Sequence, residues 1–361
     1  MVNCRKEVES LRAYVPGKPI DDVKREFNLD HVIKIASNEN PYGCSEKAKQ
    51  TIIETLKTPS LYPDGNCTKL RNAIAKKMNI ETNQLVFGAG SDELLSIIGR
   101  TFIGPSDEAI TCTPSFAQYS ASVNTMGGKI IQVPLINHTY DLNGIADQVT
   151  DRTKVIFISN PNNPTGTIIT EKEQLEFIKK IPNDILIVLD EAYYEFVSDE
   201  SYPESLPLLE EYDNLIILRT FSKMYGLASL RVGYGIAHPK IIDYINRVRG
   251  PFNVTTQAQE GAVAALSDQE FVKKVYAANN EVKKYTYEGL DRLGIEYIEG
   301  HGNFLMINFN KPSKELFVEF EKKGVILRPG YLFGMDTYQR VSLGTKEEMK
   351  VFLEACEQII K

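Results

Sequence analysis

The chain of 361 residues is 42% hydrophobic and 25% charged, which is ordinary for a soluble globular protein. Its net charge of -7 argues against nucleic acid as the main partner, because phosphate backbones require a basic surface. No apolar run approaches the ~18 residues of a membrane span, and the start MVNCRKEVES lacks the apolar stretch of a signal peptide, so we expect a cytoplasmic protein. The length exceeds a typical domain of ~50–250 residues and predicts two domains.

Cysteine and histidine residues lack the spacing of a metal site or a disulfide framework. The four histidines include no HxH or HxxxH pair, and no CxxC pair occurs. The odd number of scattered cysteines is equally unsuited to a set of disulfides; they are Cys4, Cys44, Cys67, Cys112 and Cys356. We therefore expect no metal and no disulfide.

Seven short apolar segments predict the strands of one sheet. They are apolar throughout rather than alternating, which is typical of strands that helices cover on both faces. Helical patterns such as EKEQLEFIKKI separate several of them. The segments span residues 84–88, 108–113, 129–134, 154–159, 185–190, 214–220 and 231–237. We expect an α/β fold in which residues 46–250 form a large domain with a mostly parallel seven-stranded sheet.

The pattern changes after residue 250. A long amphipathic helical stretch follows, and Ser267 is its N-cap candidate. Three shorter strand patterns, NFLMINFN, GVILRPG and YQRVSLG, precede a last helix that begins near Lys346. Residues 251–361 are therefore expected to form a smaller α+β domain. Residues 1–45 have little strand pattern and are expected to be an arm that belongs partly to this domain or contacts a second subunit.

The residues that follow each predicted strand are the site candidates, because ligands of open α/β sheets bind at the carboxyl ends of the strands. Gly90, Ser91 and Asp92 follow the first strand and precede a helical pattern. Backbone N–H groups and the dipole at such a helix N-terminus suit a phosphate. Ser91 or Asp92 could equally cap the helix, and capping is the simpler interpretation of this stretch alone.

Aromatic rings and amides follow the next strands. Phe116 and Tyr119 come after the segment 108–113, and either ring is ordinary core or a flat platform for a planar ligand. The stretch NPNNPTG follows the segment 154–159. It is turn-forming in any case, and an amide such as that of Asn163 can also donate to a ligand oxygen.

A carboxylate and a lysine complete the set. Asp190 ends an apolar strand, so its carboxylate requires a cationic or hydrogen-bonding partner. Lys223 lies in TFSKMYGLASLRVGYG, whose apolar residues disfavour a charged ammonium. A phosphate nest, an aromatic ring, an amide, a carboxylate and a lysine together fit pyridoxal 5′-phosphate. Its aldehyde forms a Schiff base with a lysine, and its ring nitrogen requires a carboxylate.

The motifs NPNNPTG, DEAYYEF and TFSKMYGLASLRVGYG resemble the signature motifs of the fold-type I, class I/II pyridoxal-phosphate aminotransferases. The resemblance covers essentially the whole chain and implies an aspartate-aminotransferase-like fold. It implies that Lys223 binds the cofactor covalently and shuttles the proton, that Asp190 pairs with the ring nitrogen, and that Tyr193 acts on the ring hydroxyl oxygen. The implied cofactor-binding residues are Gly90, Ser91, Asp92, Phe116, Asn163, Asp190, Tyr193, Thr220, Ser222, Lys223 and Arg231, with Tyr62 reaching the phosphate of a neighbouring subunit in a homodimer.

Further motifs are similar to those of the histidinol-phosphate aminotransferase branch in order and spacing: ASNENPYG, YPDG, GAGSDELL and ILRPG. This resemblance implies transamination of L-histidinol phosphate with 2-oxoglutarate. Arg328 and Arg340 are then expected to bind the substrate phosphate, since arginine pairs bidentately with such oxygens. Both could instead be surface ion-pair partners. The implied substrate-binding residues are Tyr14, lent across the dimer, Asn38, Asn163, Arg328 and Arg340.

Other functions fit the same motifs. An aromatic amino-acid aminotransferase would use Arg340 to bind a carboxylate, and dual activity is open because both substrates present a flat ring. A threonine-phosphate decarboxylase has similar motifs and would release carbon dioxide. A cofactor-binding regulatory module without turnover is a different class, and the chain has no basic helix-turn-helix extension that would support it.

Overall fold

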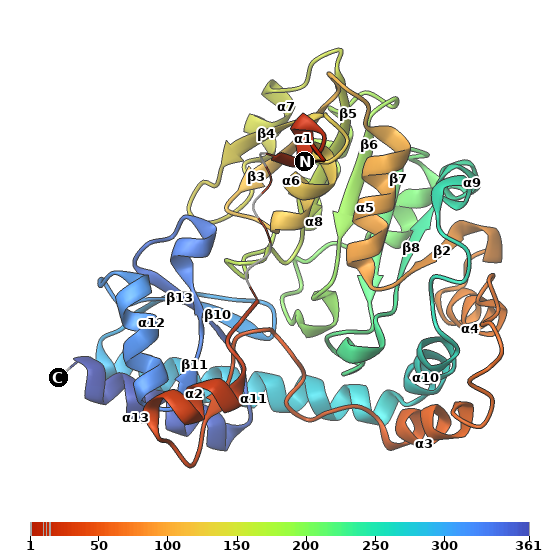
Figure 1. Cartoon of the computed structure of the whole chain (residues 1–361). Coiled ribbons are helices and arrows are strands. Elements are labelled where there is room, and N and C mark those ends of the chain that lie inside the picture. Colours follow the sequence, from red (N-terminus) through yellow and green to blue (C-terminus); the bar gives the residue numbers. More distant parts are fainter. Residues whose placement is uncertain (1, 10, 12, 14–15, 361) are drawn as a thin grey trace.

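Seven strands between Leu85 and Ala237 form the central sheet of the computed structural model, which describes residues 2–9, 11, 13 and 16–360 (Figure 1). Their spatial order is β2-β8-β7-β6-β5-β3-β4. β8 pairs antiparallel with both neighbours, and the remaining pairs are parallel. The predicted mostly parallel sheet is thus confirmed. The strands are β2 (Leu85–Gly88), β3 (Glu108–Thr113), β4 (Lys129–Pro134), β5 (Thr153–Ser159), β6 (Leu186–Asp190), β7 (Leu215–Thr220) and β8 (Gly233–Ala237).

Helices cover both faces of this sheet, and that explains the continuously apolar strands. In β5, Val155 and Phe157 enter one core cluster while Ile156 and Ile158 enter another on the opposite face. On the first face lie α5 (Ser91–Phe102), α6 (Ala117–Asn124) and α9 (Pro239–Val248). On the second lie α4 (Thr68–Met78), α7 (Leu142–Asp147), α8 (Glu171–Ile178) and α10 (Thr256–Ser267), with α3 (Glu46–Thr55) against α10.

A second, four-stranded antiparallel sheet has the order β12-β13-β10-β9. Its strands are β9 (Glu296–Ile298), β10 (Phe304–Asn308), β12 (Arg328–Pro329) and β13 (Tyr338–Ser342). A separate core cluster joins this sheet to α11 (Gln269–Leu293), α12 (Ser313–Lys322) and α13 (Lys346–Ile360). The short β1 (Ile33–Lys34) pairs in parallel with β11 (Val325–Ile326), so an N-terminal segment joins this C-terminal unit.

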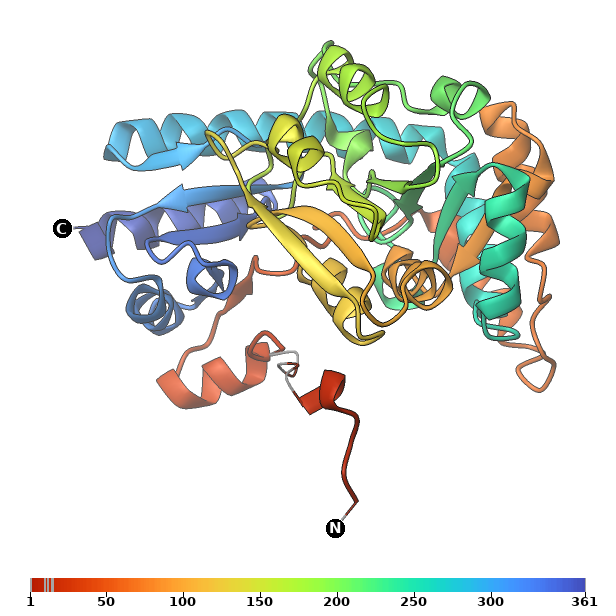
Figure 2. The same cartoon turned by 90° about the horizontal axis from the view of Figure 1, so that it is seen from above.

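The long helix α11 connects the two units and runs along one side of the molecule in both views (Figures 1 and 2). Its Val275 enters the core beneath the large sheet, whereas Val282 and Leu290 enter the core of the small one. The remaining described helices are short: α1 (Lys6–Glu9), α2 (Ile20–Phe27), and the 3₁₀ turns η1 (Thr82–Gln84), η2 (Tyr194–Phe196), η3 (Leu206–Glu210), η4 (Ala228–Leu230) and η5 (Gly330–Phe333). The domain limits at residues 45 and 250 stay a prediction.

The N-cap predicted for the long helix is wrong. Ser267 is the last residue of α10, and its hydroxyl donates to the carbonyl of Ala264 at 2.7 Å. Asp268 has a non-helical backbone, and its carboxylate accepts the N–H of Phe271 at 3.4 Å, so Asp268 is the N-cap of α11. Of the helices in the described part of the chain, none is both long and apolar enough to cross a membrane.

Candidate active site

Three predicted residues lie at the carboxyl ends of β5, β6 and β7, which are neighbours in the sheet. Asn163 follows β5, Asp190 ends β6, and Lys223 follows β7. Arg231 reaches the same edge because the antiparallel β8 begins opposite Thr220, the last residue of β7. The sheet topology therefore gathers residues that are far apart in the sequence.

Lys223 has the environment of a neutral amine. Its Nζ donates to the carbonyl of Ser37 at 3.2 Å and lies 5.7 Å from the ring centroid of Tyr193. Burial lowers the pKa of Lys223 to about 8. The positive charge of the nearby Arg340 also lowers this pKa, whereas the negative charge of Glu39 raises it. At this pKa roughly a tenth of the amine is unprotonated, and hence nucleophilic, at pH 7, which is far more than for an exposed lysine.

Asp190 is a buried carboxyl group with two hydrogen-bond donors. Its Oδ2 accepts from the hydroxyl of Tyr119 at 2.8 Å, and its Oδ1 accepts from the N–H of Ala192 at 3.3 Å. Burial raises the pKa of Asp190 to about 6 even though both hydrogen bonds favour the charged form. The predicted need for a hydrogen-bonding partner is met by Tyr119.

The turn between β2 and α5 packs closely against Arg231. Gly90 has a φ of 83°, and a Cβ there would lie 2.6 Å from Nη2 of Arg231. Arg231 donates to the hydroxyl of Ser222 at 3.4 Å and to the carbonyl of Ala228 at 3.1 Å. The hydroxyl of Thr220 donates to that of Ser222 at 3.0 Å. We call this region the phosphate corner: it brings together the first N–H groups of α5, one guanidinium and two hydroxyls. Such a set of donors suits an anion.

The interpretation of Ser91 or Asp92 as a helix cap is wrong. The N-cap of α5 is Gly90, and the carboxylate of Glu93 accepts the N–H of the preceding Ala89 at 2.6 Å. Ser91 and Asp92 instead form the first turn of the helix. Burial raises the pKa of Asp92, opposed by Arg231, and its Oδ1 is buried with no hydrogen-bond partner among the described residues.

Asn38 links Tyr193 to the small sheet. Its side chain donates to the hydroxyl of Tyr193 at 3.0 Å, and its Oδ1 accepts from the hydroxyl of Ser342 at 2.9 Å. The Ser342 hydroxyl in turn accepts the N–H of Asn38 at 2.7 Å, and Asn303 donates to the Asn38 carbonyl at 3.1 Å. Asn38 has a left-handed φ of 54°, and these contacts hold that conformation.

Arg340 joins the small sheet to the loop after β5. It is 7% exposed and donates to Oδ1 of Asn163 at 2.6 Å and to the carbonyl of Ala36 at 2.8 Å. Its guanidinium lies 5.3 Å from the ring centroid of Phe333. The half-buried Arg328 is its direct register partner across β12 and β13. A buried Arg340 excludes the alternative of a surface ion pair for this residue.

The two aromatic candidates differ in burial. Tyr119 is fully buried, and its ring stacks on that of Phe157 with centroids 4.9 Å apart. Phe116 is half-buried at the N-cap of α6 and meets Tyr119 edge-on at 5.7 Å. Because Tyr119 packs inside the core, Phe116 is the better candidate for a platform under a planar ligand.

Tyr62, predicted to act across a dimer, lies outside this cluster. Tyr62 is 82% exposed and stacks on Phe252, with centroids 4.8 Å apart. Tyr14 lies outside the described residues. Sequence reasoning also missed Ser342, Asn303 and the hydroxyl contact of Tyr119, for which the sequence holds no local signal.

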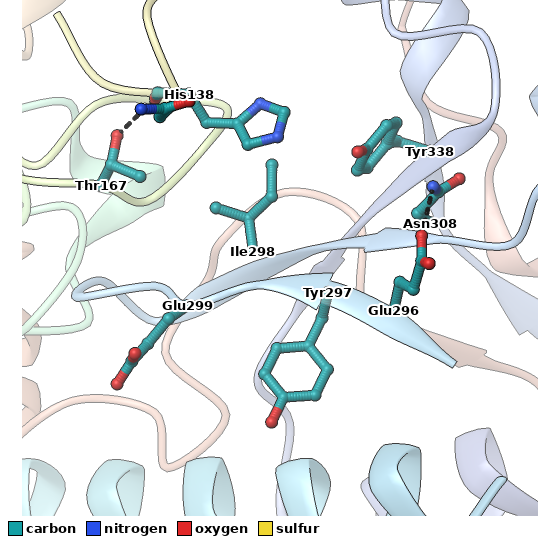
Figure 3. A pocket seen from close by; sticks show the side chains of 9 residues that line it. His138, Thr167, Glu296, Tyr297, Ile298, Glu299, Asn308 and Tyr338 are labelled. Atoms are coloured by element: carbon teal, nitrogen blue, oxygen red, sulfur yellow. Dashed lines mark hydrogen bonds between the residues drawn. The ribbon is translucent and has the colours of Figure 1, made fainter. Parts of the chain in front are cut away.

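A separate pocket lies between the loop after β4 and the small sheet (Figure 3). The imidazole of His138 lies 6.0 Å from the ring centroid of Tyr338, and Asn308 donates to Glu296 at 3.0 Å. Its lining residues are Asn137, His138, Thr167, Glu296, Tyr297, Ile298, Glu299, Asn308 and Tyr338. None of the predicted site residues that the structure describes lines this pocket.

Comparison with known proteins identifies the family. Residues 30–356 match the family model described as aminotransferase class I and II. The chain therefore belongs to the class I and II aminotransferase family. A protein of Caldicellulosiruptor saccharolyticus named histidinol-phosphate aminotransferase is 46% identical over 356 residues, which cover 99% of each chain. The Bacillus subtilis (strain 168) protein of the same name is 42% identical over 360 residues, 99% of this chain and 100% of that one.

Solved structures share the fold over the whole length. The histidinol-phosphate aminotransferase from Sinorhizobium meliloti, in complex with pyridoxal-5′-phosphate, superimposes with a TM-score of 0.91 at 24% identity over 100% of this chain and 98% of that one. A Thermus thermophilus aspartate aminotransferase double mutant gives a TM-score of 0.87 at 19% identity over 99% and 100%. The expected aspartate-aminotransferase-like fold is confirmed.

Proposed function

We propose that this protein is a pyridoxal-phosphate-dependent aminotransferase that transfers the amino group of L-histidinol phosphate to 2-oxoglutarate in histidine biosynthesis. The products are imidazole-acetol phosphate and glutamate. The family assignment and the two relatives of that name over the full length support the proposal. The substrate assignment rests on Arg328 and Arg340, two arginines that are direct register partners on neighbouring antiparallel strands.

The residues present fit pyridoxal 5′-phosphate. The corner of Gly90, Ser222 and Arg231 leaves no space for a Cβ and offers N–H, hydroxyl and guanidinium donors to a phosphate. The buried Asp190 suits a ring nitrogen, and the amine of Lys223 suits an aldehyde. The carboxylate of Asp92 is a hydrogen-bond acceptor and is unsuited to a phosphate, so only the backbone N–H of Asp92 would bind the phosphate.

Each site residue then has a defined task. When bound, the cofactor supplies an aldehyde that joins the amino group and a ring that accepts the electrons of the breaking Cα–H bond. Nζ of Lys223 would take the Cα proton of the substrate as a base and return it, as an acid, to the carbon of the former aldehyde. Ionised Asp190 would keep a proton on the ring nitrogen, and Tyr193 and Asn163 would orient the ring hydroxyl oxygen.

The substrate phosphate would lie between Arg328 and Arg340. A phosphate dianion would accept hydrogen bonds from both guanidinium groups and match their two positive charges. Asn38 and Asn163 are polar groups at the edge of this space. Tyr14 of a second subunit would contribute to the same phosphate site.

A homodimer with shared sites is part of the proposal. The exposed Tyr62 stands beside Leu61 and Phe252, and exposed apolar side chains of this density are typical of an interface. A cytoplasmic location follows from the proposed biosynthetic role. Sedimentation of the purified protein tests the dimer, and a monomer with full activity would contradict it.

Steady-state rates on a substrate panel test the function. L-histidinol phosphate, L-phenylalanine and L-threonine phosphate are each assayed with 2-oxoglutarate, and glutamate and carbon dioxide are measured. We expect the highest kcat/KM for histidinol phosphate, with ping-pong kinetics and no carbon dioxide. A higher kcat/KM for phenylalanine would favour the aromatic aminotransferase, and carbon dioxide from threonine phosphate would favour the decarboxylase. A protein with bound cofactor but no turnover would be a regulatory module.

A further inference from the structure

Tyr119 makes a contact with Asp190 that its position in the core does not require. The side chain is fully buried in α6, and stacking on Phe157 would be equally available to a phenylalanine. The hydroxyl donates to Oδ2 of Asp190 at 2.8 Å, whereas the other carboxylate oxygen receives only the longer bond from Ala192 at 3.3 Å. The tyrosine hydroxyl is thus the closer of the two hydrogen-bond donors to this carboxylate.

We propose that Tyr119 is a positioning residue that keeps Asp190 ionised and so keeps the shared proton on the ring nitrogen of pyridoxal 5′-phosphate. The inference rests on the proposed function, since it concerns that cofactor. Asp190 and the ring nitrogen compete for one proton. A hydrogen bond to the carboxylate stabilises its charged form, and the proton then resides on the nitrogen.

The surroundings of Asp190 make this donor necessary. Burial raises the pKa of Asp190 to about 6 with both hydrogen bonds in place, so loss of the stronger one raises it further. Burial and the Asp190 carboxylate raise the pKa of Tyr119 well above its usual value, so the hydroxyl keeps its proton and stays a donor. The titratable groups that face Asp190 are Asp92, Tyr119, Glu191, Tyr193 and Tyr202.

The carboxyl groups among these neighbours act against ionisation of Asp190. Asp92 on α5 and the adjacent Glu191 both raise the pKa of Asp190 through like charge. Two interactions lower the pKa of Asp190, namely the hydrogen bonds from Tyr119 and Ala192, and neither is with a cation. The ionised state of Asp190 in the described chain therefore depends on hydrogen bonding rather than on an ion pair.

Tyr119→Phe tests the inference, and Tyr140→Phe is a matched control. Tyr140 is also buried, and its hydroxyl shares hydrogen bonds with Ser115 at 2.7 Å and Thr111 at 3.2 Å rather than with Asp190. Both variants remove one buried oxygen. The holoenzyme of each is reconstituted with cofactor that carries ¹⁵N in the ring, and the ¹⁵N chemical shift reports whether the ring nitrogen is protonated.

We expect a protonated ring nitrogen in the wild type and in Tyr140→Phe, and a shift toward the unprotonated value in Tyr119→Phe. Because one hydrogen bond to a charged group is lost, the pH midpoint of the visible absorbance of the bound cofactor should rise by about one unit. The kcat should fall about tenfold with little change in KM. In the Asp190→Asn background, Tyr119→Phe should cause no further change in the absorbance midpoint.

An unchanged ¹⁵N shift and absorbance midpoint in Tyr119→Phe would overturn the inference while leaving the proposed function intact. Equal changes in Tyr119→Phe and Tyr140→Phe would also overturn it, since they would indicate a general packing effect. Failure of the wild type to take up the cofactor would overturn the proposed function and the inference together. The unfolding temperature of each variant shows that the comparison is made on folded protein.

Discussion

Arg328 and Arg340 lie directly opposite each other on neighbouring antiparallel strands, β12 and β13. Like charges in this position are unfavourable in an isolated sheet. Arg340 is fixed in place by Asn163 and Ala36, so it cannot turn away to solvent. A pair of this kind is suited to a doubly charged ligand, and the phosphate of the proposed substrate has that charge.

Substitution of Arg328 should therefore affect phosphate binding specifically. We expect Arg328→Gln to raise KM for histidinol phosphate about 10- to 100-fold, because hydrogen bonds to a charged group contribute ~1.5–3 kcal/mol. The absorbance of the bound cofactor should not change. Steady-state kinetics measure the effect, and Arg247→Gln, at an exposed position on α9, is the control. An unchanged KM would contradict the role of Arg328 in phosphate binding.

Much of the site can be predicted from the sequence because its residues directly follow apolar strands. Asp190 and Lys223 are recognisable in this way, since a charged side chain beside a buried strand requires an explanation. The contact of Tyr119 with Asp190 is not recognisable, because it joins residues 71 positions apart through the packing of α6. Ser342 and Asn38 are 304 positions apart, and only the folded small sheet brings them together.

The wrong N-cap has a similar physical explanation. α10 and α11 follow each other with Asp268 alone between them, so the polar run from Ser267 to Glu270 marks their boundary without identifying the capping residue. Ser267 and Asp268 are both good N-cap residues by type. The choice between them depends on which one leaves the helical conformation, and that depends on how α10 packs against α3 and α4.

Covalent uptake of pyridoxal 5′-phosphate by the cofactor-free protein should depend on pH through Lys223. The pKa of Lys223 is lowered to about 8, so the uptake rate should rise up to that pH and level off above it. Stopped-flow absorbance between about pH 6 and 9 measures the rate. A rate that is independent of pH would contradict a titrating amine.

Lys283 is a matched control for this uptake, because burial also lowers its pKa to about 8 and it lies outside the site on α11. Reduction with borohydride after uptake fixes the cofactor on the lysine that binds it. Mass spectrometry should find the label on Lys223 and not on Lys283. Lys283→Ala should retain the uptake rate, whereas Lys223→Ala should abolish covalent uptake.

Gly90→Ala should weaken cofactor binding. The substitution adds a Cβ 2.6 Å from Nη2 of Arg231 in a backbone with a φ of 83°. Gly43→Ala is a matched control, because Gly43 has a φ of 73° but nothing within 4 Å of the added Cβ. Both variants place an alanine at a positive φ, and Gly90 also has a ψ of 165°, a region in which strain is ~1–3 kcal/mol. Equilibrium titration should show a higher Kd for Gly90→Ala alone, and equal values would contradict the proposed role of this turn and Arg231 in cofactor binding.

Asp190→Asn should stabilise the cofactor-free protein at neutral and alkaline pH. Folding raises the pKa of Asp190 from 3.8 to about 6, so the folded chain binds this proton more tightly than the unfolded chain does. The contribution of Asp190 to stability is then fully present below pH 3.8 and is lost as the pH rises through 6. The amide does not titrate, so the advantage of the variant grows across this window to on the order of 3 kcal/mol.

Urea unfolding of the cofactor-free protein at several pH values between about 5 and 8 measures this advantage. Asp184→Asn, at an exposed position before β6, is the control and should show no such growth.

Asp190→Asn should also lose affinity for the cofactor, because the amide has no charge to offer the protonated ring nitrogen. A gain in stability together with a loss of binding would indicate that burial of the Asp190 carboxylate serves binding at the expense of folding. A constant difference between wild type and variant across the pH range would contradict the raised pKa of Asp190.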